Sequence, residues 1–278
     1  MFALLFPGQG SQTDDDRAEV EALAPDLLEA CIAAVGEDPF PRAAENTRFA
    51  QPAIFCTSLA RLRRVDAPGD AAAFGGHSLG ELTALTAAGA LSLEDGLRLV
   101  VERGRLMGEA TAGGMVVVRC DPDRAAELAA DHGLVVANDN APGQVVLSGA
   151  AELVDPTIAV AKARGLKARR LPVTGAFHSP LMAEAAEAFA ATLAEVDFAA
   201  PAVPVYCCAT AAPFTDPQRQ LAEALTAPVR WREIALAMEA AGVERYGEVG
   251  PGTVLTGLVN QTLAAPQIFD PVGSDVLA

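Results

Sequence analysis

A serine that could act as a nucleophile stands in the stretch Phe74-Gly75-Gly76-His77-Ser78-Leu79-Gly80-Glu81. Ser78 lies between Gly76 and Gly80, which is the G-x-S-x-G spacing of a nucleophile elbow. Residues 71–74 are apolar, as in a buried strand, and residues 81–88 have the composition of a helix. Glycines permit a turn too tight for a Cβ, and that turn would expose the hydroxyl beside the N–H groups of the new helix. A serine that only caps the helix is the alternative.

A serine hydroxyl needs a base within hydrogen-bond reach, and histidine has a suitable pKa. The sequence contains three histidines. His132 precedes Gly133 at the expected end of a helix, which favours a capping or surface role. His77 adjoins Ser78, so its side chain leaves the backbone in another direction and favours support of the elbow. His178 remains as the candidate base, and a half-buried turn histidine is its alternative.

Arg103 could select an acidic substrate. It falls on a helix expected to begin after Ser92, which reads as an N-cap followed by acidic residues. A buried guanidinium can hold a carboxylate through two parallel hydrogen bonds, whereas a neutral substrate would leave the guanidinium unpaired. The alternative is an arginine on the helix surface, which Arg98 and Arg105 fit better.

The composition excludes several classes of protein. The chain has 278 residues, 51% of them hydrophobic, and a net charge of -16, which disfavours nucleic acid and anionic membranes as partners. No apolar run is long enough to cross a membrane or resembles a signal peptide, so we expect a cytoplasmic location. Five scattered cysteines without C-x-x-C spacing argue against a disulfide framework and a zinc site.

The order of expected elements separates two domains. Residues 115–173 give the β-α-β-β-α-β order of a ferredoxin-like domain. Elsewhere strands alternate with helices, which predicts a mainly parallel sheet covered on both faces, and Pro52 is expected in the first turn of a helix that opens at Gln51. We therefore expect an α/β fold: a discontinuous large catalytic domain, residues 1–112 and 176–278, with an α/β-hydrolase-like core, and an inserted ferredoxin-like small domain, residues 113–175.

Five separated stretches resemble one family in order and spacing, the malonyl-CoA:acyl carrier protein transacylases of fatty-acid and polyketide synthesis. They are Phe6-Pro7-Gly8-Gln9-Gly10-Ser11-Gln12, Gly76-His77-Ser78-Leu79-Gly80-Glu81, Arg103-Gly104-Arg105-Leu106-Met107, Gly175-Ala176-Phe177-His178-Ser179-Pro180-Leu181-Met182 and Glu248-Val249-Gly250-Pro251-Gly252. Together they span nearly the whole chain. The resemblance is therefore far more specific than the elbow motif by itself.

The resemblance implies a ping-pong reaction in which a malonyl group passes from coenzyme A to a serine and then to the phosphopantetheine thiol of acyl carrier protein. It makes Ser78 the nucleophile, His178 the base and Arg103 the clamp on the malonyl carboxylate. Gln9 and the backbone N–H of Leu79 would form the oxyanion hole. Coenzyme A is then a substrate, and no metal or redox cofactor is implied.

Two further positions follow from the resemblance. Phe177 beside the histidine looks like the malonyl-selecting signature of polyketide acyltransferases, in which a bulky ring leaves little room for an α-methyl branch. Ala224 stands where the family commonly carries a glutamine whose main-chain carbonyl orients the histidine. Any residue supplies a carbonyl, so activity need not suffer. The acidic residues 14–16 and the short segment before Gln51 also depart from the family pattern.

An acidic carrier protein would be repelled by a chain of charge -16 unless basic residues gather locally. Residues 162–170 contain such a group, which we predict to be the docking surface for the carrier. Its members are Lys162, Arg164, Lys167, Arg169 and Arg170. An ordinary solvated strand edge is the alternative, and Arg61, Arg63 and Arg64 are the next candidate surface.

Other functions share some of these features. A serine hydrolase or thioesterase of the α/β class would require an acidic residue and then a histidine near the end of the chain, together with an HGGG-type motif before the elbow. A scaffold that keeps the fold without catalysis is a second alternative. Within the transferase interpretation, the chain could serve fatty-acid synthesis, polyketide synthesis or a malonate decarboxylase.

Overall fold

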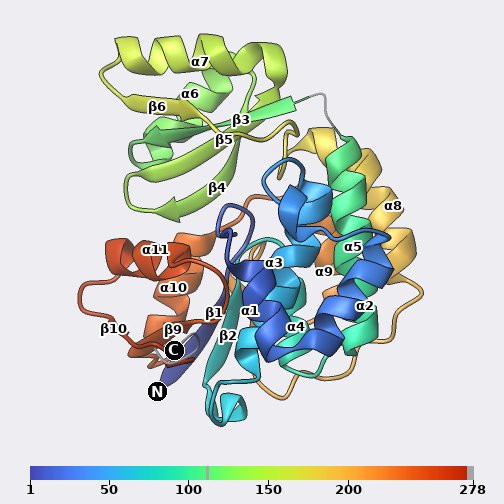
Figure 1. The fold of residues 1–278 in the computed structure, drawn as a ribbon. Helices are drawn as coiled ribbons and strands as arrows, with labels where there is room; N and C mark the ends of the chain where they lie inside the picture. The colour runs from blue at the N-terminus through green and yellow to red at the C-terminus, as the bar shows by residue number, and fades with distance from the viewer. Residues whose placement is uncertain (111–112, 274–278) are drawn as a thin grey trace.

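A computed structural model describes residues 1–110 and 113–273 of the chain, and two sheets organise them (Figure 1). The larger sheet has six strands in the order β10-β9-β1-β2-β7-β8. These strands are β1 (Phe2–Phe6), β2 (Ala73–Gly76), β7 (Val205–Cys207), β8 (Ala212–Pro213), β9 (Arg245–Glu248) and β10 (Gln267–Ile268). Neighbours from β10 to β7 are parallel and β8 is antiparallel to β7, so the sheet is mixed.

Alternate residues of the central strands face two different cores. Leu4, Phe6 and Phe74 pack in one hydrophobic cluster, while Ala3 and Leu5 pack in the other. Because side chains alternate across a strand, a run that is apolar at every position indicates a sheet buried on both faces. The short apolar strands β1 and β2 therefore define the centre of the molecule.

Helices cover both faces of the larger sheet. On the first face lie α1 (Asp16–Leu23), α2 (Pro25–Val35), α3 (Thr47–Leu62), α4 (Gly80–Ala87), α5 (Leu93–Glu109), α8 (Ala183–Leu193) and α9 (Pro217–Glu223). On the second face lie α10 (Trp231–Ala240) and α11 (Val254–Thr262). Among the described residues, no helix is both long and apolar enough to cross a membrane.

The second sheet is antiparallel and stands apart from the first at the top of Figure 1. Its strands, in spatial order, are β4 (Val135–Ala141), β5 (Gln144–Ala150), β3 (Gly113–Arg119) and β6 (Lys167–Arg170). The helices α6 (Pro122–His132) and α7 (Ala151–Ala163) pack on one face around Val116, Val118 and Leu147. The first expected domain boundary, between residues 112 and 113, adjoins residues 111–112, which lie outside the described residues.

One local prediction is wrong. The helix expected to open at Gln51 begins at Thr47, so Pro52 lies inside α3 rather than in its first turn. The true start is set by Asn46, whose side chain accepts a hydrogen bond from the N–H of Arg48 at 2.8 Å. Proline gives up one hydrogen bond within the helix. The helix tolerates this loss because almost all of it is buried between α1, α4 and α5.

Candidate active site

Ser78 lies in a strained turn between β2 and α4, where the ends of β1 and β2 run side by side. Phe6 pairs with Gly76, and the N–H of His77 donates to the carbonyl of Phe6 at 3.0 Å. Ser78 has φ 55°, which is unusual for a residue with a Cβ. A Cβ on Gly76 would collide with the main chain of Gly80, and one on Gly80 would collide with the carbonyl oxygen of Phe6. Both glycines are therefore required by the turn.

His178 is hydrogen-bonded to the serine and is oriented by main-chain carbonyls. Its Nε2 lies 2.8 Å from the Oγ of Ser78, and its Nδ1 lies 2.8 Å from the carbonyl oxygen of Ala224 and 3.2 Å from that of Ala227. Carbonyls only accept hydrogen bonds, so Nδ1 carries the proton and the lone pair of Nε2 faces the serine hydroxyl. An α/β hydrolase would instead place a carboxylate at Nδ1.

The imidazole of His178 is neutral. Burial, with the positive charge of Arg103, lowers its pKa to about 3. The carbonyls that orient it follow the C-terminal end of α9, where the last carbonyl groups of a helix lack partners in the helix and carry partial negative charge. The position of α9 therefore sets the orientation of the base.

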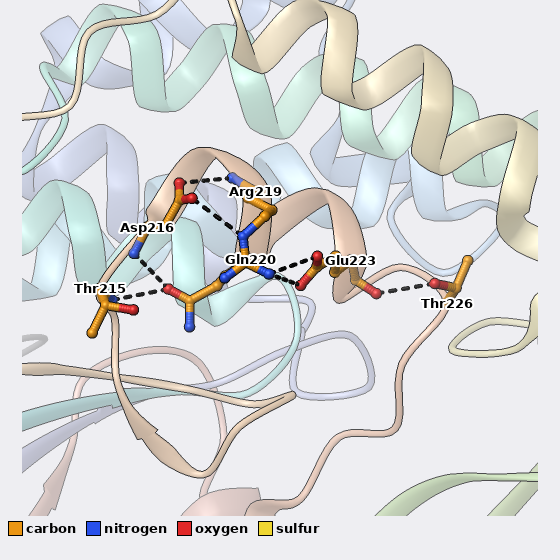
Figure 2. Close-up of polar contacts among 6 residues, drawn as sticks. All are labelled: Thr215, Asp216, Arg219, Gln220, Glu223 and Thr226. Carbon is orange, nitrogen blue, oxygen red and sulfur yellow. Dashed lines mark hydrogen bonds and ion pairs between the residues drawn. The ribbon is translucent and has the colours of Figure 1, made fainter.

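Local contacts fix α9 (Figure 2). The side-chain oxygen of Gln220 accepts from the N–H groups of Thr215 at 2.9 Å and of Asp216 at 2.8 Å. On the exposed side, Arg219 bridges Asp216 and Glu223. Figure 2 shows that all of these contacts lie within one short segment. They hold α9 in place, and the carbonyls that contact the histidine follow this helix.

Arg103 is buried beside the nucleophile. Only 3% of it is exposed, and its Nη2 donates to the Oγ of Ser78 at 3.0 Å while its Nη1 donates to the Oε1 of Gln51 at 2.9 Å. Burial, opposed by the charge of Glu81, lowers its pKa to about 10, so it stays protonated at neutral pH. Both oxygens belong to uncharged groups. The guanidinium is thus a buried cation that can receive a carboxylate.

Glu81 is a buried acidic residue in the first turn of α4, directly after the elbow. Its carboxylate accepts from the backbone N–H of Cys208 at 2.7 Å. Burial raises its pKa to about 7, while this hydrogen bond and the charge of Arg103 act in the opposite direction. The buried positive charge of Arg103 is therefore only partly balanced from below.

A cavity of about 160 Å³ surrounds these groups. Its lining comprises Gln9, Gln51, His77, Ser78, Leu79, Arg103, Met107, Met115, Asn138, Asn140, Val146, Leu171, Val173, Phe177 and His178. The volume is below the roughly 300 Å³ at which pockets for drug-sized ligands begin. The space next to Ser78 therefore suits a short acyl group.

The predicted site residues beside the catalytic pair also line this cavity. Gln9 lies in the turn after β1 and accepts a hydrogen bond from the hydroxyl of Thr47 at 2.6 Å. Leu79 caps α4, where a backbone N–H has no acceptor within its own helix. Phe177 is 7% exposed and borders the cavity next to His178. Ala224 contributes its carbonyl, as described above.

A second cavity, of about 470 Å³, continues the first toward the surface. The two share Gln9, Asn140, Val146 and Leu171. Farther out, the wall is formed by side chains of β3 and β6, and it is lined by Val117, Arg119, Lys167, Ala168 and Arg169. Cationic groups therefore border the route to Ser78.

The five basic residues predicted to dock a carrier do not form one surface. Lys167 and Arg169 border the entrance, whereas Arg170 points to the opposite side of β6 and pairs with Asp155 at 3.1 Å. Arg164 pairs with Asp131 at 2.9 Å, and Lys162 is exposed in the last turn of α7. At the end of α3, two of the three alternative candidates are paired, Arg61 with Glu19 and Arg63 with Asp26, whereas Arg64 follows in the next turn.

The sequence did not indicate several residues that build the site. Gln51 and Thr47 lie on α3 and connect Arg103 with Gln9. Asn140 lies on β4 and its side-chain oxygen is 2.8 Å from the Nε2 of His77. None of these residues belongs to a motif with a recognisable spacing.

Acyl transfer through a serine is the chemistry that this arrangement suits, and the molecule is in this sense a serine acyltransferase. Comparison with known proteins agrees. Residues 27–272 match the family described as acyl transferase domain. The malonyl CoA-acyl carrier protein transacylase of Salmonella typhimurium is 38% identical over 97% of this chain and 96% of its own length. The chain thus belongs to the family of malonyl CoA-acyl carrier protein transacylases, which confirms the resemblance seen in the five stretches.

Two other similar proteins extend the comparison. The polyketide biosynthesis protein ThaF of Burkholderia thailandensis is 42% identical over 95% of this chain, and the chain spans 24% of ThaF. A solved complex of a type II PKS acyl-carrier protein with its malonyl-transacylase matches with a TM-score of 0.89 and 31% identity, over 96% of this chain and 94% of that one. The α/β fold with a mixed sheet is therefore that of the family.

Proposed function

We propose that the protein transfers a malonyl group from malonyl-CoA to the phosphopantetheine thiol of an acyl carrier protein through a malonyl ester on Ser78. The observation that carries this proposal is the 3.0 Å contact between the buried guanidinium of Arg103 and the Oγ of Ser78. A cation at this place favours an acyl group that carries a carboxylate. The short cavity around it fits a three-carbon acyl chain.

In the first half-reaction, the hydroxyl of Ser78 gives its proton to the Nε2 of His178 as Oγ attacks the thioester carbonyl. The carbonyl oxygen becomes an oxyanion, which the N–H of Leu79 and the amide of Gln9 stabilise. The C–S bond then breaks, and His178 returns the proton to the sulfur of coenzyme A. The second half-reaction reverses these steps with the pantetheine thiol as nucleophile.

His178 is supported in this role by its two carbonyl partners. They hold the Nδ1–H tautomer without a buried carboxylate. As the imidazolium forms in the transition state, both carbonyl dipoles and the end of α9 stabilise its charge. The catalytic unit is thus a serine, a histidine and main-chain carbonyls. All steps are proton and acyl transfers among these groups, so we propose that no metal or redox cofactor takes part.

Phe177 limits the acyl group on the side of His178. It is buried, and its ring packs so closely on Gly175 that a Cβ there would collide with it. This contact restricts movement of the ring toward Gly175, which disfavours an α-methyl branch on the acyl group. We therefore infer selection of malonyl over methylmalonyl groups.

An acyl carrier protein is the proposed acceptor, as in the solved complex of the related malonyl-transacylase. Support in this chain comes from Lys167 and Arg169, which border the outer cavity. An acidic carrier seated there would bring its pantetheine arm along the wall to Ser78. We infer that the acceptor belongs to fatty-acid or polyketide synthesis, and the second is supported by two relatives that are named polyketide biosynthesis proteins.

Finer features of the fold are part of the proposal. We interpret residues 1–112 and 176–278 as an α/β-hydrolase-like catalytic domain, supported by the elbow between β2 and α4. The antiparallel order β4-β5-β3-β6 with both helices on one face supports a ferredoxin-like small domain of residues 113–175. A cytoplasmic location is supported by cysteines that are free and buried in the described residues.

Mass spectrometry of the intact protein tests the function. Mixed with malonyl-CoA, the wild type should gain one malonyl group, and addition of holo acyl carrier protein should move that group to the carrier. Ser78→Ala should gain none, whereas Ser92→Ala, which removes the N-cap of α5 at a cost of about 1 kcal/mol, should still be acylated. Uptake of malonyl by Ser78→Ala would refute the assignment, and loss of the group to water without transfer would indicate a thioesterase.

A further inference from the structure

A chain of hydrogen bonds connects the carboxylate clamp to the oxyanion hole through α3. Arg103 donates to the Oε1 of Gln51 at 2.9 Å. The Nε2 of Gln51 donates to the Oγ1 of Thr47 at 3.1 Å. The hydroxyl of Thr47 donates to the Oε1 of Gln9 at 2.6 Å. Gln51 and Thr47 are 1% and 4% exposed, so water does not replace these partners.

The direction of every bond in this chain follows from Arg103. A guanidinium has donors and no acceptor, so it must face the oxygen of Gln51. The amide nitrogen of Gln51 then faces Thr47 and donates to it. Since the Thr47 oxygen accepts this bond, its own hydrogen is left to find another acceptor. If Gln9 turned its nitrogen toward Thr47, that hydrogen would be buried without a partner, at a cost of roughly 1–3 kcal/mol.

This polarity determines what Gln9 presents to the cavity. Its oxygen is tied to Thr47, so the other end of the same amide, the Nε2 donor, is the end left for a ligand. An oxyanion is stabilised by a donor and repelled by an amide oxygen. Gln9 lines both cavities and is exposed at their junction. Without a fixed partner, its side chain would be free to rotate and to present either end.

We propose that Thr47 is a positioning residue for acyl transfer, which holds Gln9 with its Nε2 donor toward the oxyanion that forms at Ser78. The proposal rests on the proposed function, since it assumes that Gln9 contributes to the oxyanion hole. Thr47 itself touches neither the acyl group nor the reacting atoms. Thr47 also links Arg103, the proposed clamp on the carboxylate, with Gln9 of the oxyanion hole. The guanidinium of Arg103 determines the direction of the hydrogen bonds that orient Gln9.

The test uses Thr47→Val, which keeps the shape of the side chain and removes the hydroxyl. Loss of one oxyanion-hole donor typically costs about 10² to 10³ in rate. We expect kcat/KM for acylation to fall by roughly 10-fold or more, chiefly through kcat. Thr47→Ser retains the hydroxyl and should recover most of the rate. The matched control is Thr57→Val, another buried threonine of α3, whose hydroxyl donates to the carbonyl of Ala53 at 2.9 Å.

A double-mutant cycle decides whether Thr47 acts through Gln9. In a Gln9→Ala background, Thr47→Val should cause no further loss, because there is no amide left to orient. Additive losses would overturn the proposal and would point to displacement of Gln51 and Arg103 instead. A wild-type rate in Thr47→Val, or an equal loss in Thr47→Ser, would also overturn it. Melting temperatures of all variants show whether each one is folded.

The cycle is measured with malonyl-CoA and with p-nitrophenyl acetate, an activated ester without a carboxylate. Failure of the wild type to take up malonyl would refute the proposed function, and acylation of Ser78 by the ester would still report on Thr47. An effect through Gln9 should appear with both donors. An effect that appears only with malonyl-CoA would show that Thr47 acts through Arg103, and would overturn its role in positioning Gln9.

Discussion

The two walls of the active-site cavity are built differently. On the large-sheet side, Ser78, His178 and Arg103 form hydrogen bonds with one another, and each is held by further buried partners. On the small-sheet side, Met115 and Val146 present apolar groups, Asn138 and Asn140 present uncharged amides, and charged side chains appear farther out. The difference indicates that bond making depends on the first wall, whereas the fit of the acyl chain and the approach of the carrier depend on the second.

Main-chain hydrogen bonds and an ion pair connect the two walls. Val229 pairs with β4 through two main-chain hydrogen bonds, to Ala137 at 2.8 Å and from Asp139 at 2.9 Å. The carboxylate of Asp139 also pairs with Arg232 at 2.7 Å. Val229 follows closely after Ala227, whose carbonyl contacts His178. The small sheet therefore braces the segment that orients the base, although it supplies no catalytic group.

His178→Ala should have the largest effect among changes that keep the serine. The hydroxyl loses its base, and general base catalysis is worth roughly 10²- to 10⁴-fold, so acylation of Ser78 should slow by at least that factor. Rapid-quench mass spectrometry measures the rate. His132→Ala, which changes a histidine of helix α6 on the second sheet, should acylate normally. A rate within tenfold of the wild type in His178→Ala would show that the first wall does not supply the base.

Local chain geometry made Ser78 predictable from sequence, and the family resemblance indicated His178, Arg103 and the carbonyl of Ala224. Gly76 and Gly80 mark Ser78 because only glycine fits the contacts of the elbow. Thr47, Gln51 and Asn140 could not be predicted, because their partners lie 38 to 63 residues away and no turn or helix dictates the contact. The contact of the Ala227 carbonyl with His178 could not be predicted either, because every residue has a main-chain carbonyl.

Arg103→Ala should have the next largest effect and should change selectivity. Removal of the guanidinium should depress kcat/KM for malonyl-CoA and should leave or raise that for acetyl-CoA, because a neutral acyl group no longer faces an unpaired buried charge. Competition between the two thioesters, read by mass, measures the ratio. Arg105→Ala on the same helix is the control, since Arg105 pairs with Glu102 and Glu109 at the surface. Equal losses with both thioesters would make Arg103 structural.

The pH dependence of acylation tests whether burial lowers the pKa of His178. A histidine acts as a base only when it is neutral, and the pKa of His178 is lowered to about 3. We therefore expect kcat/KM to stay constant from pH about 7 down to about 4.5. With an ordinary histidine, kcat/KM would begin to decrease near pH 6.5. p-Nitrophenyl acetate is a suitable donor because it does not titrate there. Glu81, with its pKa near 7, could add an inflection, which Glu81→Gln would remove. An inflection near 6.5 that persists in Glu81→Gln would contradict the assignment.

The two buried histidines should make the folded state less stable in acid, although they leave the rate constant unchanged. Burial lowers the pKa of both His77 and His178, so the unfolded chain binds more protons than the folded one below pH about 6.5. The stability that these two neutral histidines contribute is present above that pH and is lost as the pH falls toward the lowered values. The raised pKa of Glu81 acts in the opposite direction over the same pH range, so the decline is expected in Glu81→Gln, where the melting temperature should fall on acidification while the rate constant of the folded enzyme holds. Calorimetry over the same pH range measures it.

The smallest expected effect concerns the outer end of the second wall. The sequence grouped five basic residues, but the alternation of β6 turns Lys167 and Arg169 toward the entrance and Arg170 toward α7, where Asp155 pairs with it. Arg164 is likewise paired with Asp131. Of the five, Lys167 and Arg169 are the ones that border the outer cavity, where an acidic carrier would pass on its way to Ser78. Arg119 on β3 joins them, in register with Lys167.

Charge reversal of Lys167 and Arg169 together should raise KM for the carrier severalfold, and more so at low salt, because surface charges act mainly on encounter and are screened within about 10 Å at 0.1 M salt. Acylation by p-nitrophenyl acetate, which is uncharged, should not change. The matched control reverses Lys162 and Arg164, two cations on the α7 side of the same domain. If both double variants weaken the carrier equally, docking follows the net charge of the domain. If neither does, the carrier approaches from elsewhere, and the cations at the entrance then serve another purpose than guiding it.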